Sequence, residues 1–232
     1  MNDGLQTTYG GFGVGGSFAA QRNRVLRNTY ALLALSMIPT VIGAWLGVST
    51  GVMAKMGMGM SAIIFLVGAF GFMFAIEKFN DSGIGVALLL AFTFFMGLML
   101  SRMIAMVLGF KNGAELVMTA FGGTAGVFFA MASLSSVIKR DISGLGKWLM
   151  VGVIILMVGS IINMFVGSST GMLVISVLSM AIFSAFMLYD LKQIMDGGET
   201  NYISATLTLY LDVINVFQSL LALLGIFGGE RD

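Results

Sequence analysis

The sequence has no cysteine, no histidine and a single proline among its 232 residues. Without cysteine the chain can form no disulfide and has no thiolate for catalysis or metal binding. Without histidine it lacks the commonest general base and the usual ligand of zinc and haem. Any chemistry must rest on carboxylates, hydroxyls, amides, lysine or arginine, and we expect a protein that is not an enzyme and carries no cofactor.

Charge is also scarce, since charged residues make up 10% of the chain against about 25% in a soluble domain. The net charge of +1 gives no basic field for nucleic acid, which we exclude as a partner. Hydrophobic residues make up 58%. Their runs are close to the ~20 residues that cross a bilayer as a helix, and unlike the ~10-residue alternating strands of an outer-membrane barrel. The sequence therefore predicts an all-α, polytopic protein whose main partner is the lipid bilayer.

Seven apolar segments follow one another along the chain, separated by charged or turn residues. They cover residues 28–48, 58–76, 84–107, 114–138, 148–166, 171–191 and 202–227. Residues 1–24 are rich in glycine and polar side chains and are predicted to be a disordered cytoplasmic tail. Residues 25–232 are predicted to form one seven-helix transmembrane domain.

Basic residues in short loops are retained on the cytoplasmic side of a membrane. With the amino terminus inside, eight basic residues are cytoplasmic: Arg22, Arg24, Arg27, Lys78, Lys139, Arg140, Lys147 and Lys192. Three lie on the other side: Lys55, Lys111 and Arg231. We therefore predict a multi-pass membrane protein with its amino terminus in the cytoplasm and its carboxyl terminus on the far side of the membrane.

Two glycine pairs, Gly43 with Gly47 and Gly122 with Gly126, have the four-residue spacing that lets transmembrane helices approach closely. The simplest interpretation of both pairs is ordinary helix packing within the bundle.

Ionisable side chains are costly at bilayer depth, by roughly 2.5 to 3.5 kcal/mol on insertion scales, so those found there are candidates for function. Asp212 lies about ten residues into the last apolar segment, ~15 Å from its start at helical rise. Thr208 and Asn215 share its helix face. This polar stripe must face protein or water. Arg102, inside the third segment, either extends to the interface or pairs with a buried acid or with Glu115.

Asp190, preceded by Tyr189, lies near the cytoplasmic end of the sixth segment. The short link through Gly197 predicts an antiparallel hairpin that brings Asp190 close to Asp212. Two neighbouring carboxylates in a low dielectric share a proton and titrate as a pair. The protonated pair can join two helices by a hydrogen bond, whereas the ionised pair repels itself or attracts a cation. Calcium prefers six to eight oxygens, so the pair is predicted to bind calcium in transit rather than to store it.

Two motifs around these aspartates resemble the signature of the Bax-inhibitor-one, or transmembrane Bax inhibitor motif, family. They are Leu188-Tyr189-Asp190-Leu191-Lys192-Gln193-Ile194 and Leu209-Tyr210-Leu211-Asp212-Val213-Ile214-Asn215-Val216-Phe217. The segments at 25–30 and 197–203 further resemble its bacterial YccA-like branch, which implies the bacterial inner (plasma) membrane as the location. The resemblance covers nearly all of the chain after residue 20.

The resemblance implies six helices around a central seventh, with Asp190 and Asp212 as a proton sensor in a calcium-leak pathway. It also implies an arginine at the end of the second helix as partner of the acids, where this chain has Glu77 and Lys78. The YccA-like branch is associated with the membrane protease FtsH, which gives an alternative function: modulator and substrate of that protease, through the amino-terminal tail, without conductance of its own.

Two further classes fit the sequence less well. Paired intramembrane aspartates also occur in presenilin-type proteases, but the Gly-x-Gly-Asp and Pro-Ala-Leu motifs of those enzymes are missing, since the one proline is Pro39. A transporter would carry inverted repeats of interrupted helices, and the sequence has no convincing repeat of this kind.

Overall fold

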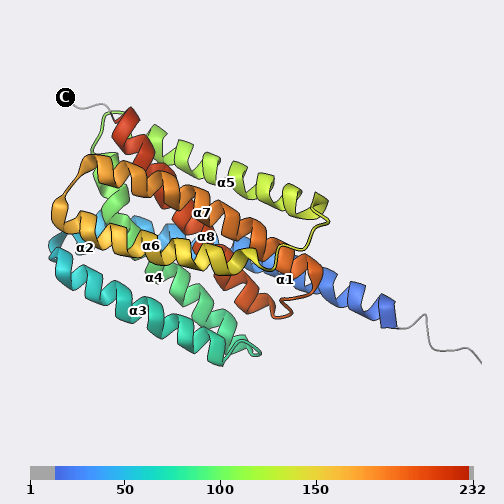
Figure 1. Ribbon diagram of the computed structural model, residues 1–232. Helices are drawn as coiled ribbons and strands as arrows, with labels where there is room; N and C mark the ends of the chain where they lie inside the picture. The colour runs from blue at the N-terminus through green and yellow to red at the C-terminus, as the bar shows by residue number, and fades with distance from the viewer. Residues whose placement is uncertain (1–13, 230–232) are drawn as a thin grey trace, which may run out of the picture.

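The computed structural model describes residues 14–229, and within that range the chain is a bundle of α-helices with no strand (Figure 1). The helices are α1 (Val14–Thr50), α2 (Val52–Lys55), α3 (Met58–Lys78), α4 (Gly83–Leu108), α5 (Gly113–Val137), α6 (Leu145–Val166), α7 (Ser169–Asp196) and α8 (Tyr202–Gly228). All except the one-turn α2 are long and apolar enough to cross a membrane. The predicted all-α class and the seven spans are confirmed.

The structure differs from the predicted tail at the start of the chain. Helix α1 begins at Val14, so residues 14–24, predicted to be disordered, belong to a helix that continues into the first span. Seven of the nine residues at 19–27 are alanine, glutamine, arginine or leucine, which favour helix, and no proline interrupts the segment. Residues 1–13 lie outside the described part of the chain.

The spans alternate in direction, so their connections fall at two ends of the bundle (Figure 1). One end of the bundle holds the start of α1 and the links at 79–82, 138–144 and 197–201. We call this end the amino-terminal side. The eight residues predicted to be cytoplasmic all lie at this side, whereas Lys55 and Lys111 lie at the other. The cytoplasmic location of the amino-terminal side stays a prediction, and the end of the chain from residue 230 lies outside the described residues.

Helix α8 is the most buried span, with half of its apolar window inside the protein against 6% for α3. It contacts α1, α3, α4, α5 and α7. Helix α6 packs chiefly against α7, and α3 chiefly against α4. The predicted arrangement of all six other helices around the last one stays a prediction.

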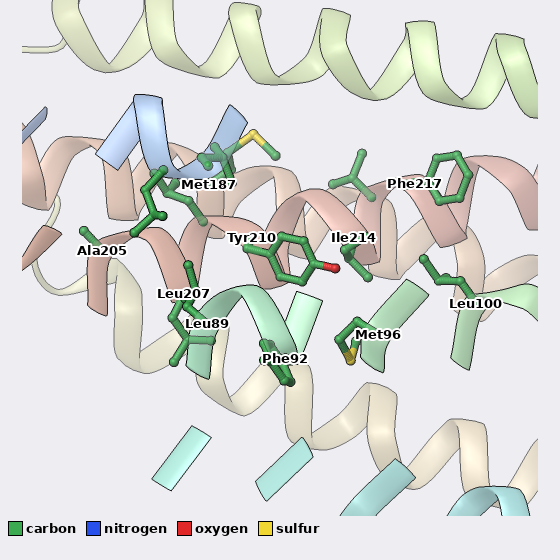
Figure 2. Close-up of a cluster of buried hydrophobic side chains, with 14 of the residues drawn as sticks. Leu89, Phe92, Met96, Leu100, Met187, Ala205, Leu207, Tyr210, Ile214 and Phe217 are labelled. Carbon is green, nitrogen blue, oxygen red and sulfur yellow. The ribbon is translucent and has the colours of Figure 1, made fainter. Parts of the chain in front are cut away.

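The core forms where α8 crosses α1 and α4, and Tyr210 lies within it (Figure 2). The Tyr210 ring is fully buried and meets the Phe92 ring edge to face at 6.0 Å. Its hydroxyl lies 2.9 Å from the Thr40 hydroxyl and 3.3 Å from the carbonyl oxygen of Thr93. A buried phenol needs such partners, so this group joins three helices by polar contacts inside an apolar core.

Glycine allows α1 and α4 to approach closely. A Cβ atom on Gly97 would collide with the carbonyl oxygen of Thr40, and one on Gly43 with that of Phe94. The Gly43 and Gly47 spacing therefore serves helix packing, as predicted. Gly122 and Gly126 differ, because both have open space around them, so this second pair packs against no other helix of the described chain.

We predict that Gly97→Ala destabilises the bundle, because the added methyl group meets backbone atoms that cannot rotate away. The expected cost is about 1–3 kcal/mol, as for an overpacked core, seen as a lower melting temperature of the purified protein in detergent. Gly122→Ala is the matched control and should leave the melting temperature unchanged or raise it. Equal melting temperatures for both variants would contradict this account of the interface between α1 and α4.

Candidate functional site

The candidate site lies between α7 and α8, which form a tight antiparallel hairpin. Helix α7 ends at Asp196 and is followed by Gly197, whose φ of 82° is a backbone conformation that suits glycine. Helix α8 begins at Tyr202 and is preceded by Asn201, whose side-chain oxygen accepts hydrogen bonds from the backbone N–H groups of Ile203 and Ser204. These two signals fix where the helices turn and therefore which residues face each other.

The hairpin places Asp190 level with Thr208. Each lies six residues from the turn end of its helix, about 9 Å at helical rise. Asp212 is one turn deeper on the same face of α8. The carboxyl of Asp190 lies close enough to interact with the hydroxyl of Thr208 and with the carboxyl of Asp212. The structure thus brings together three of the residues singled out from the sequence, and α7 continues past Asp190 to Asp196 as that contact requires.

Solvent exposure decreases from Thr208 through Asp190 to Asp212. Thr208 is exposed, Asp190 is partly exposed, and Asp212 is 4% exposed. The second oxygen of Asp212, Oδ2, has no hydrogen-bond partner among the described residues. The Thr208 hydroxyl also lies 3.2 Å from the carbonyl oxygen of Ala205, so its one proton serves either that carbonyl or Asp190. The site therefore combines a buried acceptor without a partner and a hydroxyl that can change partners.

The other predicted supporting residues do not join the pair. The Asn215 side chain donates a 2.8 Å hydrogen bond to the carbonyl oxygen of Leu211 in its own helix. Tyr189 turns toward α6, where its ring lies over Gly146. Arg102 makes no ion pair with a described residue, and it lies nine residues further from the amino-terminal side than Asp212, about 14 Å along the helices.

Few oxygen ligands surround the pair. The described residues contain no group of three or more acidic, cysteine or histidine side chains that could hold a metal ion. Asp190, Asp212 and the Thr208 hydroxyl supply fewer oxygens than the six to eight that calcium prefers. Any cation at this place would keep part of its water shell, which suits passage better than storage.

A second polar group, which we call the clasp, joins α3 to α8 at the amino-terminal side. The Ser204 hydroxyl donates to Oε2 of Glu77 at 3.1 Å, and the Asn80 amide donates to the same oxygen at 3.2 Å and to Ser204 at 3.1 Å. The Asn201 amide donates to the carbonyl oxygen of Asn80 and to the carboxylate of Asp81. The clasp therefore holds the beginning of α8, two turns before Asp212.

The clasp is not predicted by the sequence pattern. Glu77 lies at the end of an apolar segment, where a charged residue usually marks the membrane interface, and Ser204 is one hydroxyl among many. The helix-capping Asn201 was the one readable signal, and it indicates a helix start rather than a contact with α3.

Comparison of the sequence with known proteins shows which family the chain belongs to. The family model described as Inhibitor of apoptosis-promoting Bax1 matches residues 22–229. A membrane protein of Vibrio cholerae is 38% identical over 90% of this chain and 92% of its own length. The protein of Escherichia coli strain K12 named Modulator of FtsH protease YccA is 36% identical over 88% of this chain and 90% of its own length. A Pseudomonas aeruginosa protein is 34% identical over 89% of this chain and 90% of its own length. The match extends from the first span to the last, through both aspartate motifs, and this multi-pass membrane protein therefore belongs to the Bax inhibitor-1 family.

Proposed function

We propose that this protein is a pH-sensitive cation leak, in particular for calcium, whose path is controlled by Asp190 and Asp212. The observation that supports the proposal is the contact of two carboxyl groups between α7 and α8, one of which keeps an oxygen without a partner. Acids at this depth are costly and are found mainly where ions or protons pass. No catalytic role is proposed for them.

The control follows from the charge of the pair. One shared proton lets the two carboxyls form a hydrogen bond, which holds α7 against α8. When that proton leaves, two negative charges in a low dielectric repel each other and attract a cation. The helices then separate at this place, and a cation replaces the proton between them.

The gradient of exposure supports entry from the amino-terminal side. A proton or a partly hydrated cation first meets the exposed Thr208 hydroxyl, then Asp190, and last the buried Asp212. The clasp lies between this entry and α3, and it restrains the beginning of α8 through neutral and charge-assisted hydrogen bonds. In this chain we therefore assign to Glu77 and its partners the restraint that the family resemblance assigns to an arginine.

The location proposed for the protein is the bacterial inner membrane, with the amino-terminal side in the cytoplasm. The excess of basic residues at that side supports this orientation, and a relative from Escherichia coli is named an inner membrane protein.

A second candidate function is modulation of a membrane protease. It is supported by the relative named Modulator of FtsH protease YccA and by the chain that precedes the first span on the proposed cytoplasmic side. This function and the leak do not exclude each other, because they use different parts of the chain.

We predict that calcium flux into liposomes carrying the purified protein rises between pH 5 and pH 8, as the pair loses its shared proton. Asp212→Asn keeps a hydrogen bond to Asp190 without the second charge, so its flux should be low and independent of pH. Asp141→Asn, which changes an exposed carboxyl in the link at 138–144, is the matched control and should behave as the original protein. Absence of calcium flux in the original protein and in both variants would refute the proposed leak.

We predict that Ser204→Ala raises the flux at pH 5 severalfold, because it removes the hydrogen bond that ties α8 to Glu77. The same change should cost about 1 kcal/mol of stability, measured as a lower melting temperature. Ser133→Ala is the control, since that exposed hydroxyl bonds only to the carbonyl oxygen of Phe129 in its own helix. A clasp without a role in gating would give the lower melting temperature with unchanged flux.

We predict that removal of residues 1–20 abolishes modulation of FtsH and leaves the flux intact, whereas Asp212→Asn does the reverse. The readouts are degradation of an FtsH substrate in co-reconstituted liposomes and calcium flux in the same preparation. Loss of both activities in either variant would contradict the assignment of the two functions to separate parts of the chain.

A further inference from the structure

A cavity of about 270 Å³ opens at the amino-terminal side between α1, α5 and α7. It lies on a different face of α7 from the aspartate pair, because Lys192 follows Asp190 by two residues, about 200° around a helix. Its lining residues come from the first turns of the described α1 and the last turns of α5 and α7: Arg22, Asn23, Leu26, Ser135, Ser136, Lys192, Met195 and Asp196.

Two cations reach this cavity from separate helices. Arg22 is exposed, whereas Lys192 is 9% exposed and forms an ion pair with Asp196, one turn further along α7. A lysine is rarely buried to this degree. Asp196 is half exposed, so the cavity has positive charge on one part of its wall and negative charge on another.

The serine hydroxyl groups in the cavity wall already donate hydrogen bonds within the protein. Ser135 donates to the carbonyl oxygen of Ala132 or to the sulfur of Met195, and Ser136 donates to the carbonyl oxygen of Ser133. The donors left for a ligand are therefore the guanidinium of Arg22, the ammonium of Lys192 and the amide of Asn23. The serine oxygens and Asp196 remain as acceptors. This set suits a group that carries an anion and, a few ångströms away, a hydrogen-bond donor.

Apolar side chains form part of the cavity wall, and others lie next to it on α5. Leu26 and Met195 form part of the wall, and Leu134 and Val137, on the same turns of α5 as the two serines, are 43% and 71% exposed. A small inorganic anion would make no use of this surface, whereas acyl chains would lie along it. Basic cavities between transmembrane helices at the cytoplasmic side are suited to phospholipid headgroups.

We propose that this cavity binds the headgroup of a phospholipid from the leaflet at the amino-terminal side. Arg22 and Lys192 hold the phosphate, Asp196 and the serine oxygens accept from the amine or hydroxyl of the headgroup, and the acyl chains follow α5. The bound lipid fastens the start of α1 to the ends of α5 and α7. This site does not depend on the aspartate pair or on the proposed leak.

The test is native mass spectrometry of the full chain, stripped of lipid in detergent and titrated with phosphatidylethanolamine or phosphatidylglycerol. A diacylglycerol with the same acyl chains serves as the probe without phosphate. Arg22→Gln should weaken the first phospholipid bound about tenfold, the effect of one charge-assisted hydrogen bond. Arg24→Gln removes the same charge from an exposed position of the same helix that does not line the cavity, and it should leave binding unchanged.

Four outcomes would overturn the proposal. Equal weakening by both variants would indicate diffuse attraction to a basic surface, and no weakening by either would place the bound lipid elsewhere. Displacement of the lipid by millimolar inorganic phosphate, or equal binding of the diacylglycerol, would show that the cavity does not recognise a phospholipid as a whole. Lys192→Gln, checked for an unchanged elution profile, is the second variant and should weaken binding as Arg22→Gln does.

Discussion

Hydrocarbon gives no hydrogen-bond partners, and this constraint governs the position of every polar group in the bundle. Backbone groups satisfy one another within helices. Most buried hydroxyls donate to a carbonyl three or four residues earlier in their own helix, as Thr124 does to Ala120 and Ser219 to Asn215. The polar side chains that reach another helix are therefore few, and three groups of them are the Tyr210 contact, the clasp and the aspartate pair. Other contacts between helices are single hydrogen bonds, such as those from Thr206 to the carbonyl oxygen of Thr29 and from Ser135 to the sulfur of Met195.

Of these three, only the aspartate pair is incompletely satisfied. The hydroxyl of Tyr210 has partners on two helices, and Glu77 in the clasp accepts two hydrogen bonds. Asp212 keeps one oxygen without a partner in the most buried helix. A fully satisfied network makes a core rigid, whereas a group with one unmet requirement is sensitive to protons and cations. This difference is the reason for assigning control of the path to the pair and restraint of α8 to the clasp.

The spans and the approach of the two aspartates could be predicted because each rests on a local rule. Run lengths gave the helices, and Gly197 with Asn201 fixed the hairpin that aligns Asp190 with Thr208. The predictions that failed depend on the direction in which a side chain turns and on partners that lie far away in the sequence. Asn215 shares a face with Asp212 yet turns to its own backbone, Gly126 has the spacing of a packing residue and no neighbour, and the link from Glu77 to Ser204 joins residues 127 positions apart. Hydropathy also cannot tell a polar helix extension from a disordered tail, which is why the start of α1 at Val14 was missed.

Helix α7 connects the two regions to which we assign function. One face of its last turns contacts α8 through Asp190, and the next residues around the helix line the cavity with α1 and α5. Interfaces between packed helices shift as units rather than deform. A contact that holds the end of α7 on one face therefore resists its displacement at the opposite face. A lipid bound at Lys192 and a proton shared at Asp190 would therefore act on the same rigid segment. The energy needed to separate α7 from α8 would then depend on the leaflet as well as on pH.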